Sequence, residues 1–151
     1  MLIAAAIAAT PVTMTPDPAA EIAHALAPRE SFRSMILMTL DHDNAFEEVA
    51  RHVDAPRADA LLSEAAEEMS FRYADAWEAN LAQAYRTSLT PTELADALAA
   101  IRRADREALA PISVRVGVAL YHNAQRLLRK ASTEAVRHAT EEAIKFGPVG
   151  S

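Results

Sequence analysis

Three residues near the C-terminus have the spacing of metal ligands on one helix. Glu134, His138 and Glu142 follow one another at intervals of four residues. Because an α-helix completes a turn about every 3.6 residues, these side chains would project from one face and could hold a divalent metal. The same spacing is common on solvated helices, where Glu and His stabilise each other by weak pairing. We interpret the three residues in that second way and keep a metal-dependent enzyme as an alternative.

Two further groups of residues carry ligand-type side chains. Glu21 and His24 form half of the Glu-x-x-His pattern of di-iron bundles, but a second such pair is absent from the sequence. Asp41, His42 and Asp43 are adjacent, yet acidic residues around a helix start normally serve capping and the helix dipole. The sequence therefore predicts no cofactor and no bound metal.

Four residues could line a ligand pocket between helices: Trp77, Asn80, Tyr85 and Tyr121. Aromatic side chains at helical spacing more often belong to an ordinary core, where each phenol or indole finds one polar partner. A buried amide at Asn80 would also need a hydrogen-bond partner. A small-molecule-binding bundle is therefore an alternative prediction.

Composition excludes several kinds of catalytic site. With three glycines in the chain, neither a phosphate-binding loop nor a dinucleotide fingerprint can be formed. The Gly-x-Ser-x-Gly elbow is missing, and with no cysteine there is no thiol nucleophile and no disulfide. The sequence predicts that the protein is not an enzyme.

The same composition favours helices. Hydrophobic residues make up 51% of the chain, largely as alanine, and aromatic residues only 5%. Alanine has the highest helix propensity, and no segment alternates with the period of two that strands require. We expect an all-α fold: an antiparallel bundle of about six helices, two of them long, joined by short loops.

Breakers and periodic apolar residues give the expected helix bounds. Short helices are predicted at 19–27, 29–40, 45–53 and 90–105. No breaker interrupts 56–88, which predicts one long helix. Pro111 would clash inside a helix, so a break is expected at Leu109-Ala110, followed by a last helix to about Lys145. Ile112, Val116 and Leu120 supply the apolar face of that helix.

The segment 85–94 marks a helix boundary. Thr90 has the position of an N-cap, Pro91 that of the first helical residue, and Glu93 follows three residues after the cap. This arrangement is a capping box, in which Thr and Glu side chains each accept a hydrogen bond from the other residue's backbone N–H.

This segment resembles a family of secreted bacterial helical proteins, catalogued as domain of unknown function two-thousand-and-fifty-nine. Tyr85, Thr90, Glu93 and Leu94 fit its pattern of an aromatic helix end followed by a Thr-x-x-Glu-Leu cap, and the resemblance covers about 66–116. The aromatic pair and Ser-Pro-x-Gly turn usual in the family are replaced here by Ile101-Arg102 and 104–107. The resemblance implies a helical fold and export, and it indicates nothing about activity.

Charge bears on the choice of partner. The net charge of -6 argues against bulk affinity for nucleic acid or for anionic lipid. Between Arg102 and Lys130, however, basic residues outnumber Asp105 and Glu107. We interpret this run as a solvated helix face with ion pairs, and expect no nucleic-acid partner.

The N-terminus resembles an export signal. An apolar stretch at 2–9 is followed by Thr10-Pro11, and triplets such as 6–8 have the small-x-small form that signal peptidase accepts. The stretch is too short for a membrane span, and no basic residue precedes Leu2. A frayed tail on a cytosolic protein is the alternative.

These observations predict a signal-peptide-like leader and linker at 1–18, one helical domain at 19–146 and a tail at 147–151. We expect a periplasmic or secreted, non-enzymatic protein that acts through protein or cell-envelope interactions and is not an integral membrane protein.

Overall fold

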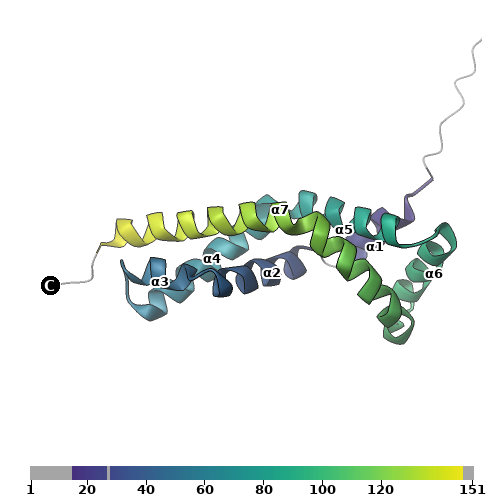
Figure 1. Cartoon of the computed structure of the whole chain (residues 1–151), viewed down its shortest axis with the longest axis horizontal. Helices are drawn as coiled ribbons and strands as arrows, with labels where there is room; N and C mark the ends of the chain where they lie inside the picture. The colour runs from purple at the N-terminus through teal and green to yellow at the C-terminus, as the bar shows by residue number, and fades with distance from the viewer. Residues whose placement is uncertain (1–14, 27, 148–151) are drawn as a thin grey trace, which may run out of the picture.

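The computed structural model describes residues 15–26 and 28–147, and within them it contains seven α-helices and no strand (Figure 1). The predicted all-α fold is confirmed. The helices are α1 (Pro18–Ala25), α2 (Pro28–His42), α3 (Ala45–Ala50), α4 (Ala55–Arg72), α5 (Ala74–Ser88), α6 (Pro91–Arg102) and α7 (Arg106–Phe146).

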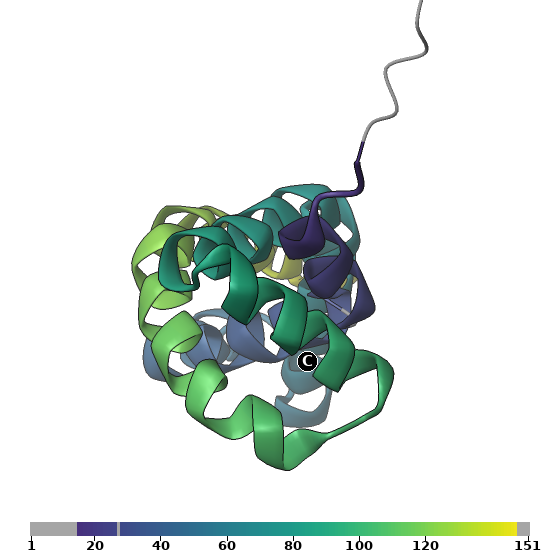
Figure 2. The same cartoon turned by 90° about the vertical axis from the view of Figure 1, so that its right-hand side faces the viewer.

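The helices form an elongated antiparallel bundle with α7 along its length. In Figure 1, α2 and α7 run in one direction, and α4 and α5 run in the opposite direction. Figure 2 shows the same bundle from one end, with the helices gathered around a common axis. At 41 residues, α7 is about 60 Å long and reaches from one end of the bundle to the other.

The predicted helix start at Thr90 is confirmed, and α4 begins with a similar cap at Asp54. The Asp54 carboxylate accepts a hydrogen bond from the Arg57 backbone N–H at 2.9 Å. Thr90 accepts from the Glu93 N–H at 3.2 Å, and Glu93 accepts from the Thr90 N–H at 2.8 Å. These bonds satisfy backbone donors that have no partner inside the helix.

The prediction of one continuous helix over 56–88 is wrong. The chain leaves helical geometry at Tyr73, whose φ and ψ are -109° and 13°, and this residue separates α4 from α5. No loop is inserted, because the Trp77 N–H still donates to the Tyr73 carbonyl at 2.9 Å. The Tyr73 hydroxyl donates to Glu134 of α7 at 2.7 Å, so the break lies at a contact between distant segments and not at a Gly or Pro.

The predicted break at Leu109-Ala110 is also wrong. Helix α7 begins at Arg106, after the cap residue Asp105 accepts from the Ala108 N–H at 3.1 Å, and Pro111 lies inside the helix. Proline lacks the N–H that would bond to the carbonyl of Glu107. Glu107 is exposed, so water can satisfy that carbonyl, and the cost of one proline in the second turn is limited.

The domain bounds differ slightly from those predicted. Asp17 and Pro18, expected in the linker, form the start of α1, where the Asp17 carboxylate accepts from the Ala19 N–H at 3.1 Å. At the other end, Gly147 has a φ of 66° and ends α7. The leader-like stretch 2–9 lies outside the described residues.

The bundle has two hydrophobic cores in series. One core contains buried residues of α2, α3, α4, the start of α5 and the C-terminal part of α7, among them Phe32, Met69 and Trp77. The other contains residues of α1, α5, α6 and the N-terminal part of α7, among them Ile22 and Tyr85. Leu120 of α7 packs against both cores, so α7 connects them.

Alanines line the buried face of α7 in the first core. The fully buried positions are Ala124, Ala131, Ala135, Ala139 and Ala143. Helix α4 presents small buried residues as well: Ala58, Ala65 and Ala66. Because alanine side chains are short, helices that meet through them can lie close together.

We expect Ala135→Leu to lower the free energy of unfolding by about 1–3 kcal/mol, because the added carbons have no space in a fully buried position. Urea denaturation followed by circular dichroism would measure the change. Ala108→Leu, at an exposed position of the same helix, is the matched control and should change stability by less than about 0.5 kcal/mol. Equal effects of the two substitutions would contradict close packing at Ala135.

A second prediction concerns the stability of the fold at low pH. A hydrogen bond from Arg115 is the main cause that lowers the pKa of Glu93 from 4.5 to about 2, with further help from the Thr90 N–H. Because the folded-state pKa is depressed, this carboxylate stabilises the fold fully above about pH 4.5 and loses that effect as pH falls toward 2. Glu93→Gln should therefore be less stable than the original chain at pH 7, with a difference that shrinks steadily between pH 4.5 and 3. A difference independent of pH would contradict the assignment.

Candidate functional site

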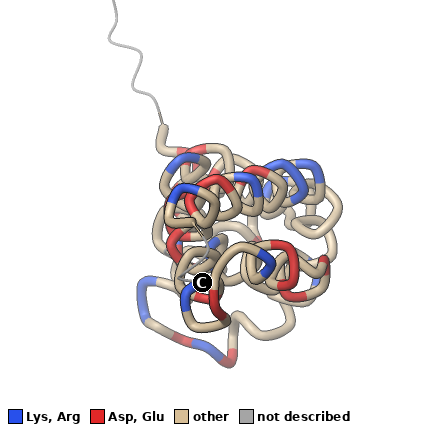
Figure 3. Tube along the Cα trace, turned by 90° about the vertical axis from the view of Figure 1, so that its left-hand side faces the viewer, with Lys and Arg blue, Asp and Glu red and all other residues tan. Residues whose placement is uncertain are grey.

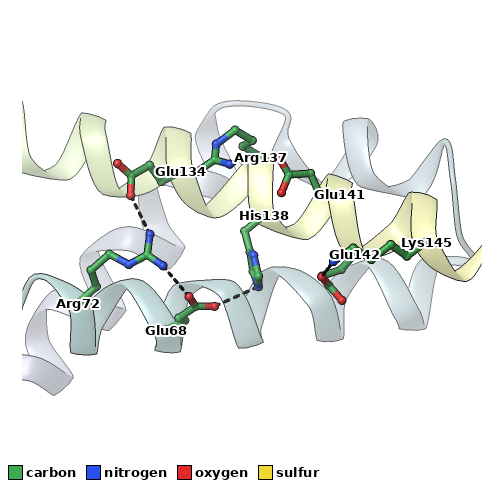
Figure 4. Close-up of polar contacts among 8 residues, drawn as sticks. All are labelled: Glu68, Arg72, Glu134, Arg137, His138, Glu141, Glu142 and Lys145. Carbon is green, nitrogen blue, oxygen red and sulfur yellow. Dashed lines mark hydrogen bonds and ion pairs between the residues drawn. The ribbon is translucent and has the colours of Figure 1, made fainter.

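The three residues with metal-ligand spacing contact different partners. Glu134 accepts hydrogen bonds from the Tyr73 hydroxyl at 2.7 Å and from Arg72 at 3.2 Å. The His138 Nε2 atom lies 3.0 Å from a carboxylate oxygen of Glu68 (Figure 4). Both side chains thus point from α7 toward α4 and its junction with α5.

Glu142, one turn further along α7, pairs with Lys145 of the same helix at 2.5 Å. In the part of the chain that the structure describes, no three His, Asp or Glu side chains gather closely enough to hold a metal ion. The structure therefore places Glu134 and His138 in a ladder of polar contacts that joins α4 to α7, whereas Glu142 pairs within α7.

The other ligand-type residues also make separate contacts. Glu21 pairs with Arg102 of α6 at 2.8 Å, whereas His24 lies 3.2 Å from Glu78 of α5. The His42 Nδ1 atom lies 2.7 Å from the backbone carbonyl of Met38, one turn earlier in α2. Glu21 and His24 thus hold α1 against its neighbours and do not converge.

The structure does not bring together the aromatic residues that were considered as a pocket lining. Trp77 is buried, stacks on Phe32 with ring centroids 4.8 Å apart, and donates its indole N–H to the Ser31 hydroxyl at 3.1 Å. Its aromatic ring therefore belongs to the first core.

The remaining residues of that set lie elsewhere. Tyr85 is buried in the second core, and this burial raises the pKa of its hydroxyl. Tyr121 is 58% exposed, and its ring lies edge-on to that of His122 with 5.9 Å between the centroids. Asn80 is half-buried on α5. The structure does not bring these residues together, because equal helical spacing does not show which core, if any, a side chain enters.

A groove of about 440 Å³ lies between the end of α2, α3 and the C-terminal part of α7. Leu40 and Val136 are among its apolar residues, and Ser132 and Thr140 each have a buried hydroxyl without a hydrogen-bond partner. Sequence analysis missed this groove, although Ser132 stands out as a polar residue within the alanine face. Either hydroxyl could rotate to the carbonyl one turn earlier, so the groove does not require a ligand.

A second feature missed from the sequence is an apolar row on the N-terminal part of α7. Val114, Val118 and Tyr121 are 71%, 59% and 58% exposed. Their spacing of four and three residues places them on one face, away from the buried Val116. This part of α7 runs at an angle to the rest of the helix (Figure 1). The available signal was that 114 and 118 fall outside the predicted apolar face at 112, 116 and 120.

Positive charge accompanies this row. From Ala108 to Thr133 the chain has no Asp or Glu but contains Arg115, Arg126, Arg129 and Lys130. Two of these cations are engaged within the bundle: Arg115 pairs with Glu93 at 3.0 Å, and the Lys130 ammonium lies 5.4 Å from the centroid of the Tyr73 ring.

The other two cations form no ion pair with a described carboxylate. Arg126 and Arg129 line a hollow of about 480 Å³ together with His122, Asn123 and Gln125. Elsewhere the two signs are mixed, as at the connection between α6 and α7 at the lower left of Figure 3. We call the surface made by Val114, Val118, Tyr121, His122, Arg126 and Arg129 the α7 outer face.

Comparison of the chain with protein-family models, with curated proteins and with solved structures gives no match. Among the described residues, no helix combines the length and the apolar character needed to cross a membrane. The interpretation of this protein therefore depends on the chemistry of its own surfaces.

We expect Tyr73→Phe to raise the pKa of Glu134 toward its ordinary value, because the hydrogen bond from the Tyr73 hydroxyl is the main cause that lowers it. A pH titration of the Glu134 carboxyl carbon by NMR would measure the shift. Tyr121→Phe removes an exposed hydroxyl from α7 and should leave the pKa of Glu134 unchanged. An unaltered pKa in Tyr73→Phe would contradict the contact between α5 and α7.

Proposed function

We propose that this protein is an exported, non-enzymatic helical-bundle protein that acts by binding at the cell envelope, with the α7 outer face as its contact surface. The observation that carries the proposal is a row of exposed apolar residues on α7 beside two arginines that form no ion pair with a described carboxylate. The leader-like residues 2–9 support export.

Single exposed apolar side chains are ordinary on protein surfaces and need no explanation. Met38 of α2 is such a residue, at 63% exposed. The α7 outer face differs because three exposed apolar side chains follow one another within two helical turns. An apolar row bordered by polar residues is typical of a surface that contacts a partner.

The proposed role is binding, because the side chains of this face are better suited to non-covalent contact than to catalysis. Valine supplies apolar area, tyrosine an amphipathic ring, and arginine a fixed array of hydrogen-bond donors.

A second candidate function is small-molecule binding in the groove between α2, α3 and α7. The buried, unpaired hydroxyls of Ser132 and Thr140 favour it, because a polar ligand could supply their missing hydrogen bonds. Ser132→Ala distinguishes the two candidates. This substitution would weaken the binding of a ligand in the groove and leave envelope association unchanged.

We expect Val114→Ser combined with Val118→Ser to shift the protein out of the envelope fraction when cells expressing the full chain are fractionated. Loss of apolar contact area at the proposed surface is the physical reason. Met38→Ser, at a similarly exposed apolar position of α2, is the control and should leave the distribution unchanged. Equal distributions for the valine variant and the original chain would contradict the proposed surface.

The same fractions test export. Sequencing of the mature N-terminus should show removal of the leader, and an intact Met1 in the cytosol would reject this part of the proposal.

A further inference from the structure

We infer that the partner of the α7 outer face is the surface of an anionic phospholipid bilayer, with the valines and Tyr121 entering the interface and the arginines binding headgroup phosphates. This inference rests on the proposed function and names the partner of the same surface. It differs from the expectation drawn from net charge, because that expectation averages over the whole chain.

The α7 outer face follows the axis of one helix. Residues 114, 118, 121, 125 and 129 follow one another at intervals of three or four and so lie along one side of α7, and His122 and Arg126 border that side. From Val114 to Arg129 this side extends about 22 Å at 1.5 Å per residue. A helix that presents such a side can lie along a bilayer surface instead of crossing it.

The rest of the described chain leaves this side of α7 uncovered. Gly117 lies between the two valines, and a Cβ atom built on it meets nothing within 4 Å. Val114, Val118 and Tyr121 each expose more than half of their surface. An approaching bilayer would therefore meet these side chains directly.

The α7 outer face has an apolar half, made by Val114, Val118 and Tyr121, and a polar half, made by His122, Arg126 and Arg129. The valines provide apolar area, and Tyr121 has the amphipathic ring that is enriched at the level of lipid headgroups. Arg126 and Arg129 line the hollow with the side chains of Asn123 and Gln125, all of which can donate hydrogen bonds. The planar guanidinium group can bind a phosphate through two parallel hydrogen bonds. The hollow is thus suited to a phosphate, and the row beside it to hydrocarbon.

The size of this face fits a bilayer better than a protein partner. A stable protein interface buries roughly 800 Å² on each side, and two valines and one tyrosine provide much less. A bilayer does not need that area, because its anionic headgroups add attraction for each arginine near the surface. The net charge of -6 repels such a surface at long range, but at physiological salt charges beyond about 8 Å are largely screened.

The test uses the purified full chain and vesicles of two compositions: phosphatidylcholine alone, and phosphatidylcholine mixed with phosphatidylglycerol. Co-sedimentation should show binding to the mixed vesicles and little binding to phosphatidylcholine alone. Binding should weaken as salt is raised, because the attraction to headgroups is screened. Circular dichroism would confirm that each variant is folded.

Two variants examine the two halves of the face. Arg126→Gln with Arg129→Gln should weaken binding to the mixed vesicles by roughly 30-fold, because each cation contributes to the attraction. Val114→Ser with Val118→Ser should weaken it by at least about 10-fold. The matched control is Arg103→Gln with Arg137→Gln, which removes the same charge from exposed positions outside the face and should bind like the original chain.

A direct measurement comes from Tyr121→Trp. The native Trp77 is buried and stays in a constant environment, so a blue shift of emission on binding would report the new indole. Brominated lipid should quench that emission.

The inference is overturned by equal binding to both kinds of vesicle, by no binding to the mixed vesicles, or by arginine variants that bind like their control. Self-association that the valine variant abolishes would identify a second copy of the chain as the partner instead. If vesicles fail to bind while envelope association still depends on Val114 and Val118, the lipid inference fails and the proposed function stands. If the valine variant alters neither, both fail.

Discussion

Close contact between α7 and the helices packed on it is the constraint on which the structure depends. The buried face of α7 is almost entirely alanine over its C-terminal part, and α4 presents alanines as well. Helix axes in proteins lie roughly 8–10 Å apart, with the distance set by the side chains at the contact. With alanines at the contact, polar side chains at its edge can pair across it, as Glu134 does with Arg72 and His138 with Glu68. The ladder of Figure 4 is a consequence of that packing.

Because α7 is far longer than its neighbours, different helices cover it along its length. Its C-terminal part is covered by α2, α3 and α4, and its N-terminal part by α5 and α6. The sides of the helix that α2 and α3 contact near Val136 are uncovered near Val118. The exposed apolar row is thus the continuation of a partly buried side of α7 beyond the end of the elements that cover it. This arrangement relates the proposed contact surface to the architecture.

Helix starts were predictable because capping is local. Thr90 and Glu93, or Asp54 and the N–H of Arg57, lie within one turn of each other, so residue type and spacing suffice. The break at Tyr73 was not predictable, because its partner Glu134 is distant in sequence. At Pro111 the sequence predicted a break that the structure does not have, because a proline is accommodated near the start of a long helix. The surroundings of the candidate site residues were not predictable for the same reason, since they depend on which distant side chains meet.

The sequence by itself determined that the chain is helical, where most helices begin, and which catalytic motifs are missing, because propensity, capping and motifs depend on neighbouring residues. Only the tertiary structure decided the partners of Glu134, His138 and Trp77, and left Val114, Val118 and Tyr121 uncovered. Periodicity identifies the faces of a helix, but burial depends on whether another element of the right length lies against each face. In this protein α7 extends beyond α2, and that difference in length creates the exposed surface.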